Sequence, residues 1–397
     1  MKEPKIRFKE FKGEWESIPF SKIMNRISTS GQAGTLPGVE FEDIDSGEGR
    51  LNKDVYQKEC NKYGKLFQNG DILFGKLRPY LKNILLADFE GIAIGDFWVL
   101  RSLDNDSKFL YTLVNTDSFM KIANTSSGSK MPRADWNLVS STEFSISSDK
   151  NEQIAIGNFF TTIDAQISAS ASRLASLKQM KAASLQAMFP QEGETVPKIR
   201  FKGFEGEWET VKLSECLEIS NERNLNNDFG TNEVLSVSDE EGVMNQIKLL
   251  GRSYAGKSVT NYKVLRTNQV VYTKSPLKAK PYGIVKVNKG EIGIVSVLYA
   301  VYNAKDGVSP DYIHYYFEPT FRINNYLLPL INKGAKNTMN ISDEASLQGN
   351  IVIPKTIDEQ CKIVDYFQSL DRQITLQSQR LEKLKQVKAT CLDKMFV

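Results

Sequence analysis

The chain has 397 residues, which is enough for two or three domains with substantial cores. It carries 51 basic and 48 acidic residues, and its formal net charge is +3. This balance excludes a polycation, so any surface that binds nucleic acid must be local.

Cysteine and histidine are too few and too scattered for the common metal sites. The four cysteines form no CxxC pair, and His314 is the only histidine. The usual zinc ligand spacings are therefore absent, and the cysteine usage suggests a reducing compartment. The first residues contain no apolar signal core, and no run approaches the roughly 18 apolar residues of a membrane span, so we expect a cytoplasmic protein.

The start of the chain is duplicated. Residues 4–24 return as residues 197–217, at an offset of 193, with 12 of 21 positions identical. Trp15 and Trp208 each follow a Gly-Glu pair and precede a short amphipathic run. This position favours a structural role, as anchors of a domain edge, over stacking on bases.

Residues 25–150 form the first globular block. Its short apolar runs, separated by Gly, Asn and Asp, predict strands and turns, whereas residues 107–123 have helical spacing. A polar loop, NTSSGSKMPRADWN, and an apolar strand complete the block. The block is therefore mixed α and β, without regular βαβ alternation.

A long helical stretch follows, and it also occurs twice. Residues 151–189 and 358–396 align without a gap at an offset of 207, and 17 of the 39 pairs are identical. Such identity over this length indicates an internal duplication. Both copies carry an apolar heptad seam, which predicts that the two helices, each about 55 Å long, pack on each other as a coiled coil. Burial of each helix in a separate core is the alternative.

The predicted seam comprises Phe160, Ile163, Ile167, Leu174 and Leu177 of the first copy and Phe367, Leu370, Ile374, Leu381 and Leu384 of the second. Polar seam positions recur at the same heights, which weakens the seam but helps to fix its register. Other apolar side chains lie outside the seam and indicate surfaces for docked partners: Phe159, Leu185, Tyr366 and Leu392.

A short linker, residues 190–196, leads to the second block, residues 218–357. The sequence of this block resembles that of the first block only in its pattern of residue types, with matched pairs such as Tyr63/Tyr262 and Leu66/Leu265. The flanking segments thus agree closely, whereas the block interiors differ. The helices and edge segments must therefore have the same role in both halves of the chain, whereas each block must have a role of its own.

Few motifs for catalysis occur in the sequence. No GxGxxG follows a strand, and there is no Asn-Pro-Pro-aromatic tetrapeptide. One stretch, GRSYAGKS at residues 251–258, matches the spacing GxxxxGK[ST]. His314 lies on a predicted helix and is interpreted as a satisfied, partly buried histidine, and the acidic residues 239–241 lie in a polar turn and are interpreted as solvated. Binding is therefore the better functional class.

Each block has basic residues among turn formers at two corresponding places. Arg and Lys can contact phosphates or guanine edges, and Asn can pair with adenine, so these loops could read a groove of DNA. The candidates are Lys76, Arg78 and Lys82, which correspond to Lys274, Lys278 and Lys280, and Lys130 and Arg133, which correspond to Lys336 and Asn337. Two similar domains held apart by a rod also suit two half-sites that lie one or more helical turns, each roughly 34 to 36 Å, apart.

The order block, helix, block, helix, together with GDILFGKLRPYLKN, the GSKMPRADW loop, IPKTIDEQCKIVDYFQSLD and the RLxxLKxxK run, resembles the specificity subunit of a type I restriction-modification system. The resemblance implies an α+β fold with an internal pseudo-two-fold repeat, in which two mixed α/β target recognition domains are separated by two long antiparallel helices that form a coiled-coil spacer. The implied domains are a first recognition domain (1–150), a first spacer helix (151–190), a linker and second recognition domain (191–357) and a second spacer helix (358–397).

The resemblance further implies a non-catalytic subunit that recognises a bipartite, asymmetric site in double-stranded DNA. Two methyltransferase subunits would dock on it, and restriction subunits would join the full complex. S-adenosylmethionine, ATP and Mg²⁺ would belong to those partners, with no cofactor and no metal in this chain. The alternatives are a free-standing bipartite DNA-binding regulator and a nuclease, which would need converging acidic metal ligands.

Overall fold

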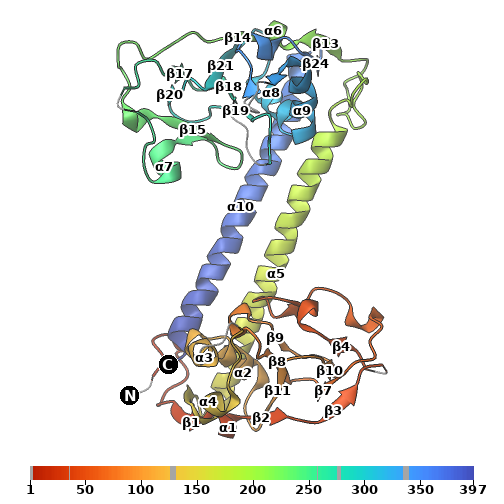
Figure 1. Cartoon of the computed structure of the whole chain (residues 1–397), viewed down its shortest axis with the longest axis vertical. Helices are drawn as coiled ribbons and strands as arrows, with labels where there is room; N and C mark the ends of the chain where they lie inside the picture. The colour runs from red at the N-terminus through yellow and green to blue at the C-terminus, as the bar shows by residue number, and fades with distance from the viewer. Residues whose placement is uncertain (1–2, 35, 126–130, 257, 275–278, 334–338) are drawn as a thin grey trace. The chain divides into compact units, whose positions relative to one another are not determined.

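The computed structural model describes residues 3–34, 36–125, 131–256, 258–274, 279–333 and 339–397 (Figure 1). The chain forms two compact units. Unit 1 comprises residues 1–173 and 377–397, and unit 2 comprises residues 174–376. Each unit therefore contains one globular block and one part of each of the two long helices.

Unit 1 is built on two four-stranded sheets. One has the order β2-β11-β8-β9 and is antiparallel throughout, and the other has the order β3-β7-β10-β4, with β10 and β4 parallel. The edge strand β1 pairs with β12. The strands are β1 Glu16–Pro19, β2 Met24–Ile27, β3 Ser30–Gln32, β4 Gly38–Val39, β5 Ile44–Asp45, β6 Arg50–Leu51, β7 Tyr63–Phe67, β8 Ile72–Gly75, β9 Ile84–Leu86, β10 Gly91–Ala93, β11 Phe97–Ser102 and β12 Glu143–Ile146.

Short helices cover the core of unit 1, and the predicted helical stretch at 107–123 divides into two of them. Asp106 and Thr116 cap their N-termini through side-chain oxygens, as the ends of helices require. The helices are α1 Phe20–Ile23, α2 Ser107–Val114, α3 Asp117–Ala123 and α4 Trp136–Ser141, with 3-10 turns η1 Phe41–Asp43, η2 Val55–Gln57 and η3 Pro79–Leu81. Phenylalanine and tryptophan side chains fill the core beneath them.

Unit 2 repeats this topology. Its four-stranded sheet has the order β14-β21-β18-β19, which matches β2-β11-β8-β9, and β13 pairs with β24 as β1 pairs with β12. The strands are β13 Glu209–Lys212, β14 Leu217–Ile219, β15 Leu235–Ser238, β16 Gly242–Asn245, β17 Lys263–Leu265, β18 Val270–Thr273, β19 Val285–Val287, β20 Gly293–Val295, β21 Tyr299–Ala304, β22 Asn332–Lys333, β23 Met339–Asn340 and β24 Asn350–Ile353. The helices are α6 Leu213–Cys216, α7 Gln246–Leu250, α8 Pro310–Phe317 and α9 Thr320–Leu327, with 3-10 turns η4 Thr231–Glu233, η5 Leu328–Leu330 and η6 Ala345–Leu347.

The two units differ in their second sheet. In unit 2 it is reduced to β17 and β20. The partners that β3 and β4 provide in unit 1 become single bridges, antiparallel from Arg223 to Lys263 and parallel from Val234 to Ile294. The common frame is therefore kept, and the change lies inside the block, where the sequence repeat is weakest.

Two continuous helices complete the fold: α5, Lys150–Ala187, and α10, Ile357–Met395. The seam positions predicted from the heptads are buried or half-buried along both helices. In unit 1, Gln377 donates to Ser170 at 2.7 Å and Lys388 pairs with Asp164 at 2.6 Å, so the residue numbers run in opposite directions. The contacts from Lys181 to Asp371 and from Ser184 to Tyr366 show the same antiparallel sense in unit 2.

The duplicated edge anchors each block to a long helix through the same contacts. In unit 1, Arg7 Nε and Nη2 donate to the buried carboxylate of Glu152 at 2.6 and 2.9 Å, and Trp15 Nε1 donates to it at 3.2 Å. In unit 2, Arg200 and Trp208 make the same three bonds to Glu359, at 2.7, 2.8 and 3.2 Å. Both tryptophans are buried, and the predicted structural role is confirmed.

The interpretation of the off-seam apolar residues as docking surfaces is wrong. Phe159 packs edge-on against Phe8, and Leu392 packs against the same core. Leu185 is buried in the core of unit 2, and Tyr366 packs against Phe201. The chain covers these side chains with its own blocks, because each helix end is also part of a domain core.

No helix within the described ranges is both long and apolar enough to span a lipid bilayer.

Candidate DNA-contact loops

In unit 1, the structure brings together the two loops predicted to contact DNA. Leu77, in the loop after β8, forms an antiparallel bridge with Arg133. The backbone N–H of Arg78 donates to Pro132 O at 2.8 Å, and that of Ala134 donates to Lys76 O at 2.8 Å. Segments more than 50 residues apart thus form one surface whose backbone is hydrogen-bonded from both sides.

One carboxylate neutralises two of the cations on this surface. Asp96, in the turn between β10 and β11, accepts from Arg133 Nη2 at 2.8 Å and lies 3.4 Å from Lys76 Nζ. The Arg133 side chain is still 61% exposed, so its other N–H groups face solvent. Lys76 and Arg133 therefore have an internal partner that the sequence pattern did not reveal.

Lys82 and Lys280 have the same structural role in the two blocks. Lys82 Nζ donates to Asn115 O, at the end of α2, at 3.3 Å, and Lys280 Nζ donates to Glu318 O, at the end of α8, at 2.8 Å. The last carbonyls of a helix lack partners within the helix and attract cations. These amino groups satisfy such carbonyls, so they are held within the protein.

Lys280 also lies 3.3 Å from Asp239, which lies 3.5 Å from Lys286. The Asp239 side chain is still 38% exposed, in agreement with the interpretation of the turn 239–241 as solvated, but it also pairs with lysines some 40 residues away in the sequence.

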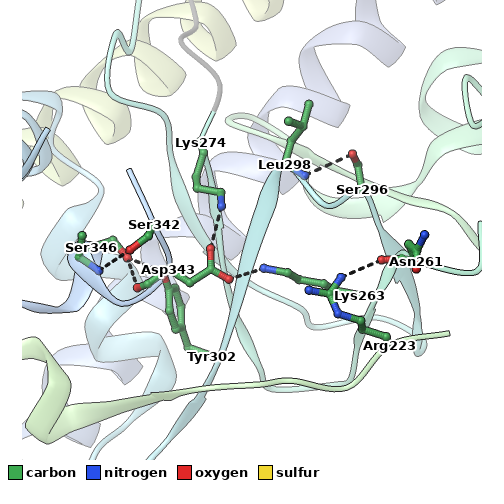
Figure 2. A network of polar contacts seen from close by, with 11 residues as sticks. Arg223, Asn261, Lys263, Lys274, Ser296, Leu298, Tyr302, Ser342, Asp343 and Ser346 are labelled. Atoms are coloured by element: carbon green, nitrogen blue, oxygen red, sulfur yellow. Dashed lines mark hydrogen bonds and ion pairs between the residues drawn. The ribbon is translucent and has the colours of Figure 1, made fainter. Parts of the chain in front are cut away.

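In unit 2, a half-buried carboxylate joins the two corresponding segments (Figure 2). Asp343 pairs with Lys274, at the end of β18, at 2.7 Å, and with Lys263 of β17. Burial by itself would raise the pKa of Asp343, but the hydrogen bonds from Lys263 and Lys274 outweigh it and hold the pKa below its ordinary value. Ser346 Oγ donates to Asp343 O at 2.7 Å, and Tyr302 Oη lies 2.5 Å from Ser346 Oγ.

This network ties Lys274 to the segment that enters η6, as the backbone bridge ties the two loops of unit 1. Both blocks therefore connect the same two segments, through backbone hydrogen bonds in unit 1 and through the ion pairs of Asp343 in unit 2. Four of the predicted DNA-binding residues lie outside the described residues: Lys130, Lys278, Lys336 and Asn337.

Arg78 is the remaining candidate. Its side chain is exposed and has no hydrogen bond or ion pair with any described residue. The next side chain but one, Tyr80, is 55% exposed. Arg78 is thus the one described candidate whose charged group is engaged by no described residue.

His314 is hydrogen-bonded inside unit 2. Its Nδ1 lies 3.0 Å from Val285 O. Burial, with a smaller contribution from the nearby Lys286 charge, lowers its pKa to about 3. The imidazole is therefore neutral near pH 7, and the prediction of a satisfied histidine is confirmed. The described part of the chain has no group of three or more His, Cys, Asp or Glu residues that could hold a metal ion.

Comparisons with known proteins agree with this architecture. Residues 205–386 match the family model described as the type I restriction modification DNA specificity domain. The fold resembles the S subunit of a type I restriction-modification system from M. genitalium, with a TM-score of 0.60 and 13% identity over 100% of this chain and 99% of that chain. It also resembles a chain from a structural study of complex assembly and conformational transition in a type I R-M system, with a TM-score of 0.51 and 18% identity over 97% of this chain and 98% of that chain.

Among curated protein sequences, none matches the chain significantly. The family model rests on sequence and covers the second block with much of its helix, whereas the solved structures share the fold over the full length. The resemblance drawn from the sequence is confirmed: residues 205–386 match the DNA specificity domain of type I restriction-modification systems, and the whole chain has the fold of solved type I chains, one of them an S subunit.

Proposed function

We propose that this chain recognises a bipartite, asymmetric site in double-stranded DNA, with one part read by each block, and that it performs no catalysis itself. One observation carries the proposal: both units have the same frame, but their loops are joined differently. The Arg–Glu–Trp anchor and the four-stranded sheet recur, whereas a backbone bridge joins the loops in unit 1 and Asp343 joins them in unit 2. A shared frame with different loops suits two half-sites of different sequence.

A few base contacts in each block would suffice for discrimination. A mismatched base pair costs about 1 to 3 kcal/mol, so about five to seven read pairs in all give strong selection over non-specific DNA. Contacts to phosphates would set the register of each block.

The chemistry would belong to partner subunits in the cytoplasm. We propose two methyltransferase subunits, which supply the S-adenosylmethionine site, and restriction subunits, which use ATP and Mg²⁺, in the full complex. One of the similar solved structures comes from a study of how a type I R-M system assembles, which supports such partners. The comparisons give no support to the alternative, a free-standing regulator.

The test is long-read methylation profiling of cells that express the candidate methyltransferase partner with and without this chain. The expected result is a new split motif, with two defined parts and a fixed gap, that appears only when the chain is present. An unchanged methylome, with the partner shown to be active, would contradict the proposal. DNA cleavage by the isolated chain would contradict its non-catalytic role.

A further inference from the structure

The loop after β8 contains two cations in an unusual backbone conformation. Arg78 has φ 49° and ψ 62°, Lys82 has φ 51° and ψ 45°, and the two bracket the turn η3. The only other non-glycine residues with positive φ in the described ranges are Asn227 and Asn268. Asparagine tolerates the left-handed region, but a long side chain does so at a cost in free energy that the surroundings must offset.

The surroundings fix Arg78 through both of its backbone groups. Its N–H donates to Pro132 O at 2.8 Å, and its carbonyl accepts from Leu81 N at 2.9 Å. Pro79, which follows it, is buried. The guanidinium is therefore carried by a rigid turn, although it projects into solvent.

The neighbouring cations differ from Arg78, because each already has a partner. Asp96 neutralises Lys76 and Arg133, and the end of α2 holds Lys82. No described residue accepts any of the five N–H donors of Arg78, which lie in the planar fork that matches an oxyanion. A rigid guanidinium that is unpaired within the described ranges is prepared for an anion outside the protein.

The repeat indicates which anion. The sequence places a cation in the corresponding loop of the second block, Lys278, two residues beyond the position equivalent to Arg78, although the block interiors otherwise differ. If the blocks read different half-sites, a charge common to both suits what the half-sites share. Base edges differ between two sequences, whereas phosphodiester groups do not. The loop contacts that differ between the blocks are then left to read bases.

We propose that Arg78 binds a backbone phosphate of duplex DNA and sets the register of the first block, and that it does not read a base. This inference rests on the proposed function. It predicts that the loss of Arg78 weakens binding to every DNA sequence and leaves the recognised motif unchanged.

The experiment uses the complex of this chain with its methyltransferase partner and duplexes with and without the motif found by methylation profiling. Binding is measured from about 50 to 200 mM salt for the wild type, Arg78→Gly, Arg78→Lys and Lys22→Ala. Glycine adopts the left-handed conformation without strain, so Arg78→Gly removes the side chain and keeps the turn. Lys22, an exposed lysine of α1, is the control for net charge.

One lost phosphate contact lowers the slope of log affinity against log salt by about 0.9, so the fourfold salt increase weakens Arg78→Gly binding about 3.5-fold less than it weakens the wild type. We expect this change on both duplexes, with an unchanged methylation motif, with the wild-type slope in Lys22→Ala, and with recovery in Arg78→Lys. A motif relaxed at one position, an unchanged slope, or an equal change in Lys22→Ala would each overturn the inference. If the wild-type complex methylates no split motif, the proposed function itself fails, which is a separate outcome.

Discussion

The buried carboxylate of Glu152 should contribute strongly to the stability of unit 1. Its side chain is inaccessible to solvent and accepts four hydrogen bonds: two from Arg7, one from Trp15 at 3.2 Å and one from Ser147 at 2.5 Å. Glu152→Gln keeps the shape, but it replaces one acceptor oxygen with an NH₂ group that faces donors. Loss of one member of a buried pair costs about 3 to 5 kcal/mol, and the 15% exposure of Arg7 places the expected loss near the lower limit, about 3 kcal/mol.

Glu359→Gln in unit 2 is the matched comparison. Glu359 accepts the same three bonds from Arg200 and Trp208, but the position that corresponds to Ser147 is Pro354, which has no donor. We therefore expect Glu359→Gln to cost about 1 kcal/mol less than Glu152→Gln, which is the net value of one hydrogen bond. Urea denaturation followed by circular dichroism measures both.

The exposed residue Glu10 provides a control, since Glu10→Gln should change the unfolding free energy by less than about 0.5 kcal/mol. A loss below about 1 kcal/mol in Glu152→Gln would refute the reasoning, because it would mean that the carboxylate is not the required acceptor. A larger loss in Glu359→Gln than in Glu152→Gln would refute the role of the serine bond.

Three further predictions concern single side chains. Lys181→Met should destabilise by about 2 to 4 kcal/mol and Lys388→Met by about 1 kcal/mol in urea denaturation, because Lys181 pairs with two carboxylates and Lys388 with one; equal losses would contradict this. His314 has a lowered pKa in the folded state, so stability is full above about pH 6.5 and falls by about 2 kcal/mol on acidification to pH 5, and His314→Phe should remove this slope. Gly157→Ala should destabilise by about 1 to 2 kcal/mol although alanine favours helices, because its Cβ would lie 2.8 Å from the backbone nitrogen of Phe109; a raised melting temperature would contradict this.

The long helices could be predicted closely because their signal is local and repeated. The duplicated stretches at 151–189 and 358–396 correspond to α5 and α10 within one or two residues at each end. The seam followed from the heptads, since a 4-3 apolar spacing has few other solutions. The sequence alone also indicated that the two blocks share one topology, through Tyr63/Tyr262 and similar pairs.

The electrostatics of the loops could not be predicted, because they depend on contacts between distant segments. Asp96 and Asp343 decide which cations are available, yet neither stands near its lysine or arginine partner in the sequence. Similarly, Lys82 binds a helix end 33 residues away, which no local motif reveals. A list of basic loop residues therefore overstates the free charge.

The off-seam residues depend on distant segments in the same way. The heptad pattern alone makes Phe159 and Leu185 partner surfaces, because a two-helix rod does not need them. In the structure, the ends of each helix are also walls of a block. Heptad analysis identifies the helix face that meets another helix, but it does not show where a globular domain covers the remaining faces.

The backbone contact of Ile6 with Lys394 gives the chain the connectivity of a ring. Ile6 N donates to Lys394 O at 2.9 Å, and its repeat equivalent, Ile199, donates to Ala187 O at 2.9 Å. The second junction is spanned by the linker at 190–196, whereas the first lies between residues at opposite ends of the sequence. A polypeptide in which a similar linker joined residue 397 to residue 4, and which was opened at 190–196 instead, would therefore keep both of these backbone contacts, although it would put at risk the bond from Trp208 N to Thr195 O. The position at which the chain is opened would then decide which of the two blocks comes first in the sequence.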